Sequence, residues 1–381
     1  MIVVMSAVSG EFSSVLSTVR LRLRAWRAAI CIALTTAAVV AFSGPGSASP
    51  DPSYYQEGMD RVHAAGFVEK QTVIDGYTTN YAEGPDNGRP LLLIHGQGSR
   101  WQDYMRVLPE VASRFHVFAV DVYGHGESDR LPASEYTNRR VGALTASFID
   151  GIIGEPVVIS GHSSGGLIAA WVAANRADLV RGIVLEDPPL FSSIMPRAAK
   201  TVGGNLALVT HDFVSQDSEQ DFQKYYVERS NYFSFLGLAA PLVAMYSSGY
   251  IDSHPEQPLE VPFMPPEVNI FFRGLVDYDP VFGARWYDNS WYEGFDTEAN
   301  LSAIAAPSVL IHTDYWFERN GTYYDQNGIL MAAMDANDVA KATSLLKTNV
   351  AVVNVGSGHL VHFEDPDSYM RALSELEAKL E

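Results

Sequence analysis

The sequence has 381 residues, of which 47% are apolar and 19% are charged, and its formal net charge is −19. This composition excludes a disordered or fibrous protein, and the length suits one large α/β domain with an insertion or two smaller domains. The acidic balance argues against nucleic acid and anionic membranes as partners.

The first fifty residues have the pattern of an export signal. Four arginines between positions 20 and 27 precede an uncharged apolar run at 28–42, and Gly46 and Ala48 suit cleavage just after Ala48. This run is shorter than the roughly 20 residues that span a bilayer. We expect residues 1–48 to be a cleaved signal peptide and the protein to be secreted or periplasmic, in a bacterium, without stable membrane association. An uncleaved membrane anchor is the alternative.

The cysteine content limits the chemistry of the mature chain. Cys31 is the only cysteine, and it lies in the apolar run of the signal. The mature chain would therefore have no disulfide, no cysteine nucleophile and no cysteine-based metal site.

Short apolar runs that alternate with helical patterns predict an α/β fold. Runs at 67–74 and 77–83 are joined by Asp75-Gly76, a strong hairpin signal. The later alternation predicts βαβ units and a mostly parallel sheet covered on both faces. Further strands are expected within 90–96, 116–129, 156–166, 181–190, 307–316 and 349–360, and helices within 101–114, 137–152, 167–180, 335–346 and 366–380.

Between residues 191 and 301 the alternation stops. This stretch holds 20 of the 43 Phe, Trp and Tyr residues and has Pro and Gly breaks between helical fragments. We expect a helical lid inserted into a core formed by 54–190 and 302–381. The aromatic content suggests a roomy apolar pocket for a bulky or aromatic substrate, and ordinary packing of lid on core explains it equally well.

A serine stands in a turn between a predicted strand and a predicted helix. Gly161-His162-Ser163-Ser164-Gly165 is a G-x-S-x-G motif in the context that a strained, exposed nucleophile needs. The amides at the start of the following helix would stabilise negative charge near the serine. The motif predicts that Ser163 is a nucleophile; a small-residue turn without chemistry is the alternative.

A serine hydroxyl needs a base to act as a nucleophile. His359 lies in a Gly-rich loop just after the last predicted strand and is the expected base. His362, three residues later, is expected to be structural.

Four motifs together resemble the α/β-hydrolase superfamily, in its serine-nucleophile esterase or lactonase branch with a lid insertion. They are HGQG (95–98), DVYGHGES (121–128), GHSSGG (161–166) and GSGHLVHFEDP (356–366), in the order of that family. The resemblance implies an oxyanion hole formed by the backbone N–H groups of Gln97 and Ser164. It also implies a structural role for His125.

The acid that completes the triad is ambiguous. Members of that family often carry it after the seventh strand in a Gly-x-x-Asp loop, but here Trp316 stands at that position and Asp314 comes two places early. Some relatives carry it 24 residues past the nucleophile, which is Asp187 here. We favour Asp187, with Asp314 and then Glu186 as alternatives.

These features predict a secreted serine hydrolase that cleaves carboxylic esters or lactones through an acyl-enzyme. A C–C bond hydrolase of ring-cleavage products and a non-catalytic binding protein on the same fold remain alternatives. The resemblance also includes epoxide hydrolases, but those use an aspartate where Ser163 stands. The sequence has no phosphate-binding loop and no zinc-type histidine spacing, so we expect neither metal nor cofactor, and a small molecule as the partner. It does not indicate an oligomeric state.

Overall fold

The computed structural model describes residues 53–346 and 350–380. The predicted signal peptide and its cleavage site lie outside these residues. None of the helices in the described ranges combines the length and apolar character that crossing a bilayer requires.

The described residues form one eight-stranded sheet in the order β1-β2-β4-β3-β5-β6-β7-β8. β2 pairs antiparallel with both of its neighbours, β1 and β4, and the other pairs are parallel. The mostly parallel α/β fold predicted from the sequence is therefore confirmed. The strands are β1 (Val68–Ile74), β2 (Tyr77–Glu83), β3 (Pro90–Ile94), β4 (His116–Val120), β5 (Val157–His162), β6 (Val180–Glu186), β7 (Ser308–Thr313) and β8 (Val350–Val355).

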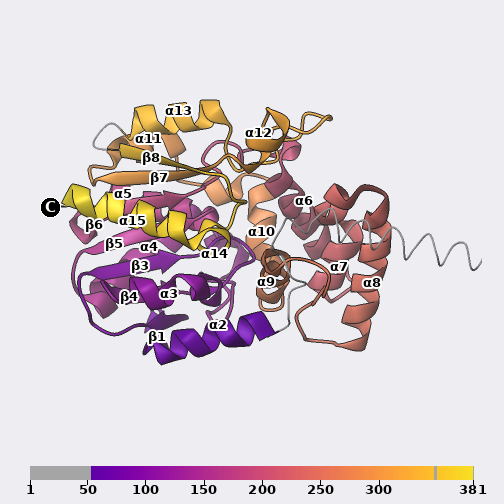
Figure 1. Ribbon diagram of the computed structural model, residues 1–381, viewed down its shortest axis with the longest axis horizontal. Helices are drawn as coiled ribbons and strands as arrows, with labels where there is room; N and C mark the ends of the chain where they lie inside the picture. The colour runs from indigo at the N-terminus through magenta and orange to yellow at the C-terminus, as the bar shows by residue number, and fades with distance from the viewer. Residues whose placement is uncertain (1–52, 347–349, 381) are drawn as a thin grey trace, which may run out of the picture.

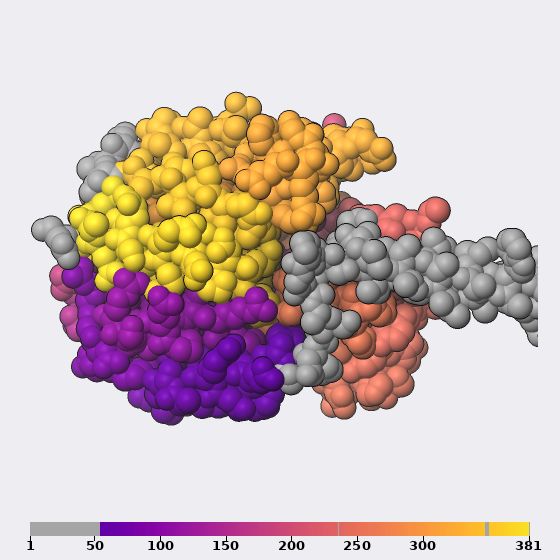
Figure 2. Space-filling view, in the orientation of Figure 1, coloured from indigo at the N-terminus to yellow at the C-terminus, as the bar shows by residue number. Residues whose placement is uncertain are grey.

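Helices cover both faces of this sheet (Figure 1). Side chains alternate between faces along each strand, so Leu91 and Leu93 join one apolar cluster while Leu92 and Ile94 join the other. On the face seen in Figure 2, the C-terminal residues (yellow) lie between the N-terminal part of the core (indigo to purple) and the orange segment that includes the residues just after β7. The helices outside residues 191–301 are α2 (Ser53–Ala64), α3 (Leu108–Val111), α4 (Asn138–Phe148), α5 (Ser164–Asn175), α12 (Tyr315–Asn320), α13 (Ala336–Leu345), α14 (Val361–Glu364) and α15 (Pro366–Leu380), and α11 (Thr297–Ala303) begins within that range and ends just after it.

The helix predicted at 101–114 is wrong as a single element. The structure has a 3₁₀ helix, η1 (Trp101–Arg106), followed by the short α3 with Pro109 in its first turn. Proline has no N–H to donate back to the preceding turn, so it is tolerated at a helix start and not in a helix interior. The helical pattern is therefore divided just before the proline.

The segment between β6 and β7 is helical and lies to one side of the sheet (Figure 1). Its helices are α6 (Val202–Val214), α7 (Phe222–Arg229), α8 (Ala240–Ser253), α9 (Pro266–Leu275) and α10 (Pro280–Tyr287), with the 3₁₀ helix η6 (Tyr232–Ala239) before α8. We call residues 191–301 the insertion. The chain after β7 also reaches it, because Val202 N–H donates to the Leu330 carbonyl at 3.0 Å and Leu330 N–H donates to the Lys200 carbonyl at 2.9 Å.

Candidate active site

Ser163 occupies a strained turn between β5 and α5. Its backbone angles are φ 53° and ψ −120°, a region that residues with a side chain rarely adopt. A Cβ at Gly161 would lie 2.3 Å from the Gly165 carbonyl oxygen, and a Cβ at Gly165 would lie 2.4 Å from the Ile94 carbonyl oxygen. The glycines are therefore needed so that the chain can turn sharply beside β3 and hold the serine in this conformation.

His359 and Asp187 meet at the carboxyl ends of the strands. His359 Nδ1 lies 2.7 Å from Asp187 Oδ2, and Thr313 Oγ1 donates to the same oxygen at 3.0 Å. Asp187 is 1% exposed, whereas the His359 side chain is 41% exposed and lines the same pocket as Ser163. A buried carboxylate on Nδ1 holds the imidazole in the tautomer whose Nε2 can accept a proton. Among the described hydrogen bonds none joins Ser163 Oγ to His359, a contact that is often long before substrate binds.

The electrostatic surroundings favour the charged form of His359. Burial opposes protonation of the ring, but the hydrogen bond and charge of Asp187, together with the charges of Glu186 and Glu364, outweigh this effect. The pKa of His359 is therefore raised above its ordinary value of 6.5.

Strand register explains why Asp187 lies beside the serine. His162 of β5 pairs with Glu186 of β6, so the residues that follow them, Ser163 and Asp187, leave adjacent parallel strands at the same level. Ser163 N–H also donates to the Glu186 carbonyl at 2.9 Å. Asp187 has a positive φ of 42°, and its N–H donates to the Ile311 carbonyl of β7 at 3.0 Å.

The two alternative acids have other partners. Asp314 accepts a hydrogen bond from Tyr323 Oη, and it is not part of the wall of the pocket that contains His359. Glu186 Oε1 accepts from the backbone N–H of His362 at 2.9 Å and contacts the His362 ring nitrogen Nδ1 at 2.8 Å. Of the three carboxylates considered from the sequence, Asp187 is the one that the structure brings to His359.

Gln97 and Ser164 both line the pocket beside Ser163. Ser164 is the first residue of α5, so its N–H has no partner within the helix. The next amide after Gln97, Gly98 N–H, donates to His125 Nε2 at 3.1 Å. His125 must be neutral to accept this bond, and burial lowers its pKa to about 4. His125 thus supports the loop that carries Gln97.

The backbone around His359 is held from two sides. Glu364 accepts from Gly358 N–H at 2.8 Å and from Leu360 N–H at 3.1 Å, one bond on each flank of His359. His162 Nε2 lies 2.9 Å from the His359 carbonyl oxygen and must donate to it. Burial, with the neighbouring His359 and His362, lowers the pKa of His162 well below 6.5, which keeps this ring neutral.

The acid limb of the pH profile of kcat/KM should report this arrangement. His359 must be unprotonated to accept the Ser163 proton, so we expect activity to fall as the pH drops through an apparent pKa above 6.5. Glu364→Gln removes a carboxylate that stabilises the His359 imidazolium, so the acid limb should move to lower pH. The substitution also weakens the hydrogen bonds to Gly358 N–H and Leu360 N–H, which should lower kcat about tenfold. Glu110→Gln, an equal charge change at an exposed residue of α3, is the matched control. An acid limb that Glu364→Gln leaves in place would contradict this role.

The candidate site opens into a cavity of about 360 Å³. Its wall combines core residues, insertion residues and residues after β7. The aromatic part of the wall consists of Tyr226, Tyr232, Phe271, Trp286, Tyr315 and Trp316. The acidic part consists of Asp187, Glu267 and Glu364, the rings of His162 and His359 also line the cavity, and no Lys or Arg is among the described residues that line it.

Three features of the site were missed from the sequence. Thr313 supports Asp187 from the end of β7, a position that the shared carboxyl edge of parallel strands could have indicated. Glu364 lies inside the motif at 356–366, but its role is to accept hydrogen bonds from backbone amides. Such a role leaves no pattern in the sequence. Tyr315 and Trp316 line the pocket from the segment after β7, for which the sequence suggested only a candidate acid, Asp314.

The described residues contain no cluster of three or more His, Cys, Asp or Glu side chains that could hold a metal ion.

Known proteins are similar to this chain in sequence and in fold. A model described as "Alpha/beta hydrolase family" matches residues 91–372. The chain is 30% identical over 117 residues to a soluble epoxide hydrolase of Corynebacterium sp. (strain C12), over 31% of this chain and 40% of that protein. It is 34% identical over 122 residues to 2-hydroxymuconate semialdehyde hydrolase of Pseudomonas sp. (strain CF600), over 31% of this chain and 42% of that protein. The matches thus span less than half the length of these two relatives.

The whole fold also has a solved counterpart. A membrane phospholipase A described as a bacterial virulence factor aligns with a TM-score of 0.58 and 20% identity, over 96% of this chain and 98% of that one. At this identity the likeness concerns the fold alone. The family model spans well over half of the sequence, and it includes the strand–turn–helix that carries Ser163. The chain therefore belongs to the alpha/beta hydrolase family.

Proposed function

We propose that the protein is a serine hydrolase that cleaves carboxylic esters or lactones through an acyl-enzyme. The observation that carries the proposal is the Asp187–His359 pair at 2.7 Å, in the pocket that also contains the strained Ser163. Epoxide hydrolases of this fold use an aspartate as the nucleophile at this position, so the serine in this turn argues against their mechanism here.

In the proposed reaction, Ser163 Oγ attacks the carbonyl carbon of the substrate and its proton passes to His359 Nε2. The oxyanion that forms accepts hydrogen bonds from Gln97 N–H and Ser164 N–H. When the C–O bond to the leaving group breaks, His359 gives its proton to the departing oxygen. Water then donates a proton to His359 and adds to the acyl carbon, and collapse of this second intermediate releases the acid and restores Ser163.

The charge of the pocket favours an uncharged substrate. A carboxylate is usually bound by Arg or Lys, and neither is among the described residues that line this cavity, whereas Glu267 and Glu364 are. The relative named for a hydroxymuconate semialdehyde acts on a molecule that carries a carboxylate. The acidic wall therefore supports a neutral ester or lactone over an anionic ring-cleavage product, and the aromatic wall supports a bulky apolar one.

Two esters of equal chain length test this selection. We expect kcat/KM for p-nitrophenyl hexanoate to exceed that for p-nitrophenyl hydrogen adipate, whose acyl chain ends in a carboxylate. Glu267→Gln should lower the ratio of kcat/KM for the hexanoate ester to kcat/KM for the adipate ester about fivefold. The reason is that two like charges about 4 Å apart in water repel by about 1 kcal/mol. Glu110→Gln should leave the ratio unchanged. A preference for the adipate ester would favour the C–C hydrolase alternative.

The function itself is tested by a panel of p-nitrophenyl esters and lactones, together with labelling by a fluorophosphonate probe. Turnover on the panel and labelling of Ser163 support an acyl-enzyme hydrolase. A protein that is neither labelled nor active on any of these substrates would fit a non-catalytic binding role instead.

We also propose that the protein acts outside the cytoplasm, in the periplasm or the medium. The support is the arginine, apolar and small-residue order of residues 20–48. Fractionation of the native host tests this, and a protein found in the cytoplasm would overturn it, while N-terminal sequencing distinguishes cleavage after Ala48 from an uncleaved anchor.

A further inference from the structure

The side chain of Gln97 is bonded to the insertion. Gln97 Nε2 donates to Tyr278 Oη at 2.5 Å, a contact between residues 181 positions apart. Tyr278 is 2% exposed and lies between α9 and α10. Burial raises the pKa of Tyr278, so the hydroxyl stays protonated. The residue proposed to supply one oxyanion N–H is thus tied to a buried tyrosine of another segment.

The backbone of the insertion lies directly against the Gln97 loop. A Cβ at Gly274 would lie 2.1 Å from the Gly98 carbonyl oxygen, so α9 reaches this closeness only with glycine there. The His125 ring, which holds Gly98 N–H, packs with its centroid 4.9 Å from that of Tyr278 and 4.8 Å from that of Phe282. Two contacts thus support this loop, the Gln97–Tyr278 hydrogen bond and the His125 ring. Both depend on residues 278–282, which lie just before and at the start of α10.

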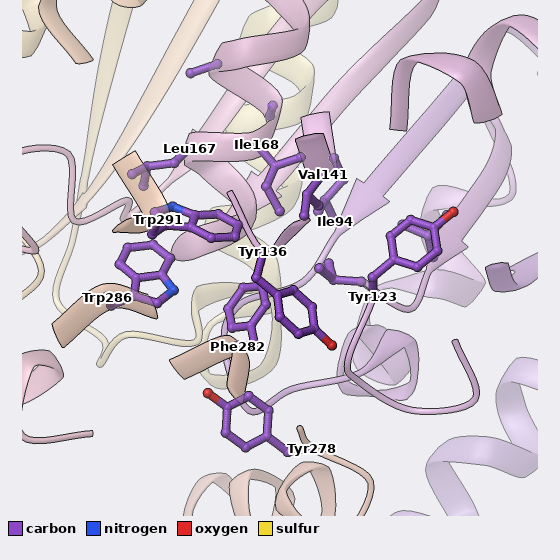
Figure 3. Close-up of a cluster of buried hydrophobic side chains, with 14 of the residues drawn as sticks. Ile94, Tyr123, Tyr136, Val141, Leu167, Ile168, Tyr278, Phe282, Trp286 and Trp291 are labelled. Carbon is purple, nitrogen blue, oxygen red and sulfur yellow. The ribbon is translucent and has the colours of Figure 1, made fainter. Parts of the chain in front are cut away.

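The same part of the insertion is bonded to other core loops. Asp279 N–H donates to the Gly124 carbonyl at 2.7 Å, and Tyr136 Oη donates to Asp279 Oδ2 at 2.8 Å. Figure 3 shows Tyr136 beside Phe282, with Tyr278 below them. Residues 274–283 therefore form a buried seam with the core, and the Gln97–Tyr278 bond belongs to it.

An oxyanion N–H stabilises the transition state only when it is held where the negative charge develops. The backbone nitrogen of Gln97 and the side chain that Tyr278 holds are bonded to the same Cα. The hydrogen bond to Tyr278 therefore restrains the direction of the Gln97 N–H. We propose that Tyr278 is a positioning residue for the oxyanion hole and acts through Gln97, so that the insertion contributes to the rate as well as to the pocket. This inference rests on the proposed acyl-enzyme function.

The test is Tyr278→Phe, which keeps the buried ring and removes the hydroxyl. Loss of an oxyanion donor costs about 10²–10³ in kcat, and a displaced donor should cost less, about 10–100-fold. We expect that fall in kcat with KM within about threefold of wild type. The rate constant for fluorophosphonate labelling of Ser163 should fall in parallel, since phosphonylation also places an oxygen in the hole.

Two further variants separate positioning from stability. Tyr136→Phe removes a hydroxyl from the same seam without touching Gln97, so it should lower the melting temperature and leave kcat within about threefold. Gln97→Met retains the backbone N–H but cannot donate from its side chain, so it should reproduce the loss of Tyr278→Phe. The double variant should then be no slower than either single variant.

The outcomes are distinguishable from failure of the proposed function. If wild-type Ser163 is not labelled, the acyl-enzyme proposal and this inference both fail. If wild type is active but Gln97→Met or a folded Tyr278→Phe keeps its kcat and labelling rate within about twofold, the inference alone is wrong. If Tyr278→Phe does not fold, Gln97→Met decides the question.

Discussion

Ser163→Ala should abolish hydrolysis of every ester that the wild-type protein turns over, with a fall in kcat of about 10⁵–10⁶. Removing the nucleophile of a serine triad has an effect of this size because the base and acid have no other group to activate. The fold should persist, since alanine fits the space of serine. The turn should also tolerate it, because the surrounding glycines determine the geometry.

The measurement is kcat on the best substrate of the ester panel, with circular dichroism and thermal unfolding to show that the variant is folded. Ser164 lies next to Ser163 in the same turn, so the labelled residue should be identified by peptide mass spectrometry of the fluorophosphonate adduct. Label on Ser164, or activity in Ser163→Ala close to wild type, would rule out Ser163 as the nucleophile.

Asp187→Asn should lower kcat by about 10⁴, the usual cost of replacing a triad acid by its amide. The Asn amide would donate to His359 Nδ1, so the remaining proton would sit on Nε2, where it blocks acceptance of the Ser163 proton. Loss of the carboxylate also removes the main contribution that raises the pKa of His359. The acid limb of the residual activity should therefore move to lower pH.

Asp314→Asn is the matched control, because Asp314 was a candidate from sequence and its carboxylate contacts Tyr323. It should keep kcat within about threefold of wild type. The assignment of the acid is wrong if Asp314→Asn loses activity and Asp187→Asn retains it.

The sheet was predictable because its signal is local. Each buried parallel strand is a short apolar run followed by a glycine-rich or polar turn, as in β3 and β5, and the helices between them keep a helical period. The spacing that indicated Asp187 also has a physical basis, since the pairing of His162 with Glu186 sets the two following residues side by side.

The rest of the site depends on contacts that no local pattern encodes. The Gln97–Tyr278 bond joins residues 181 positions apart, and the Thr313–Asp187 bond joins residues 126 apart. The insertion has Pro and Gly breaks in place of a regular αβ alternation, so its packing on the core could not be derived from periodicity. The prediction of a single helix after β3 was wrong for a local reason. Pro109 divides it, and the sequence alone shows that proline.

The buried seam at residues 274–283 has a consequence for engineering this protein. Exchanging residues 191–301 for the equivalent segment of a relative is a natural way to change substrate preference, since that segment supplies much of the pocket wall. Such a graft would also remove the hydroxyl that holds Gln97. A chimera that accepts the new substrate but turns it over slowly would then need repair at position 97, in the recipient core, and not further changes in the grafted segment.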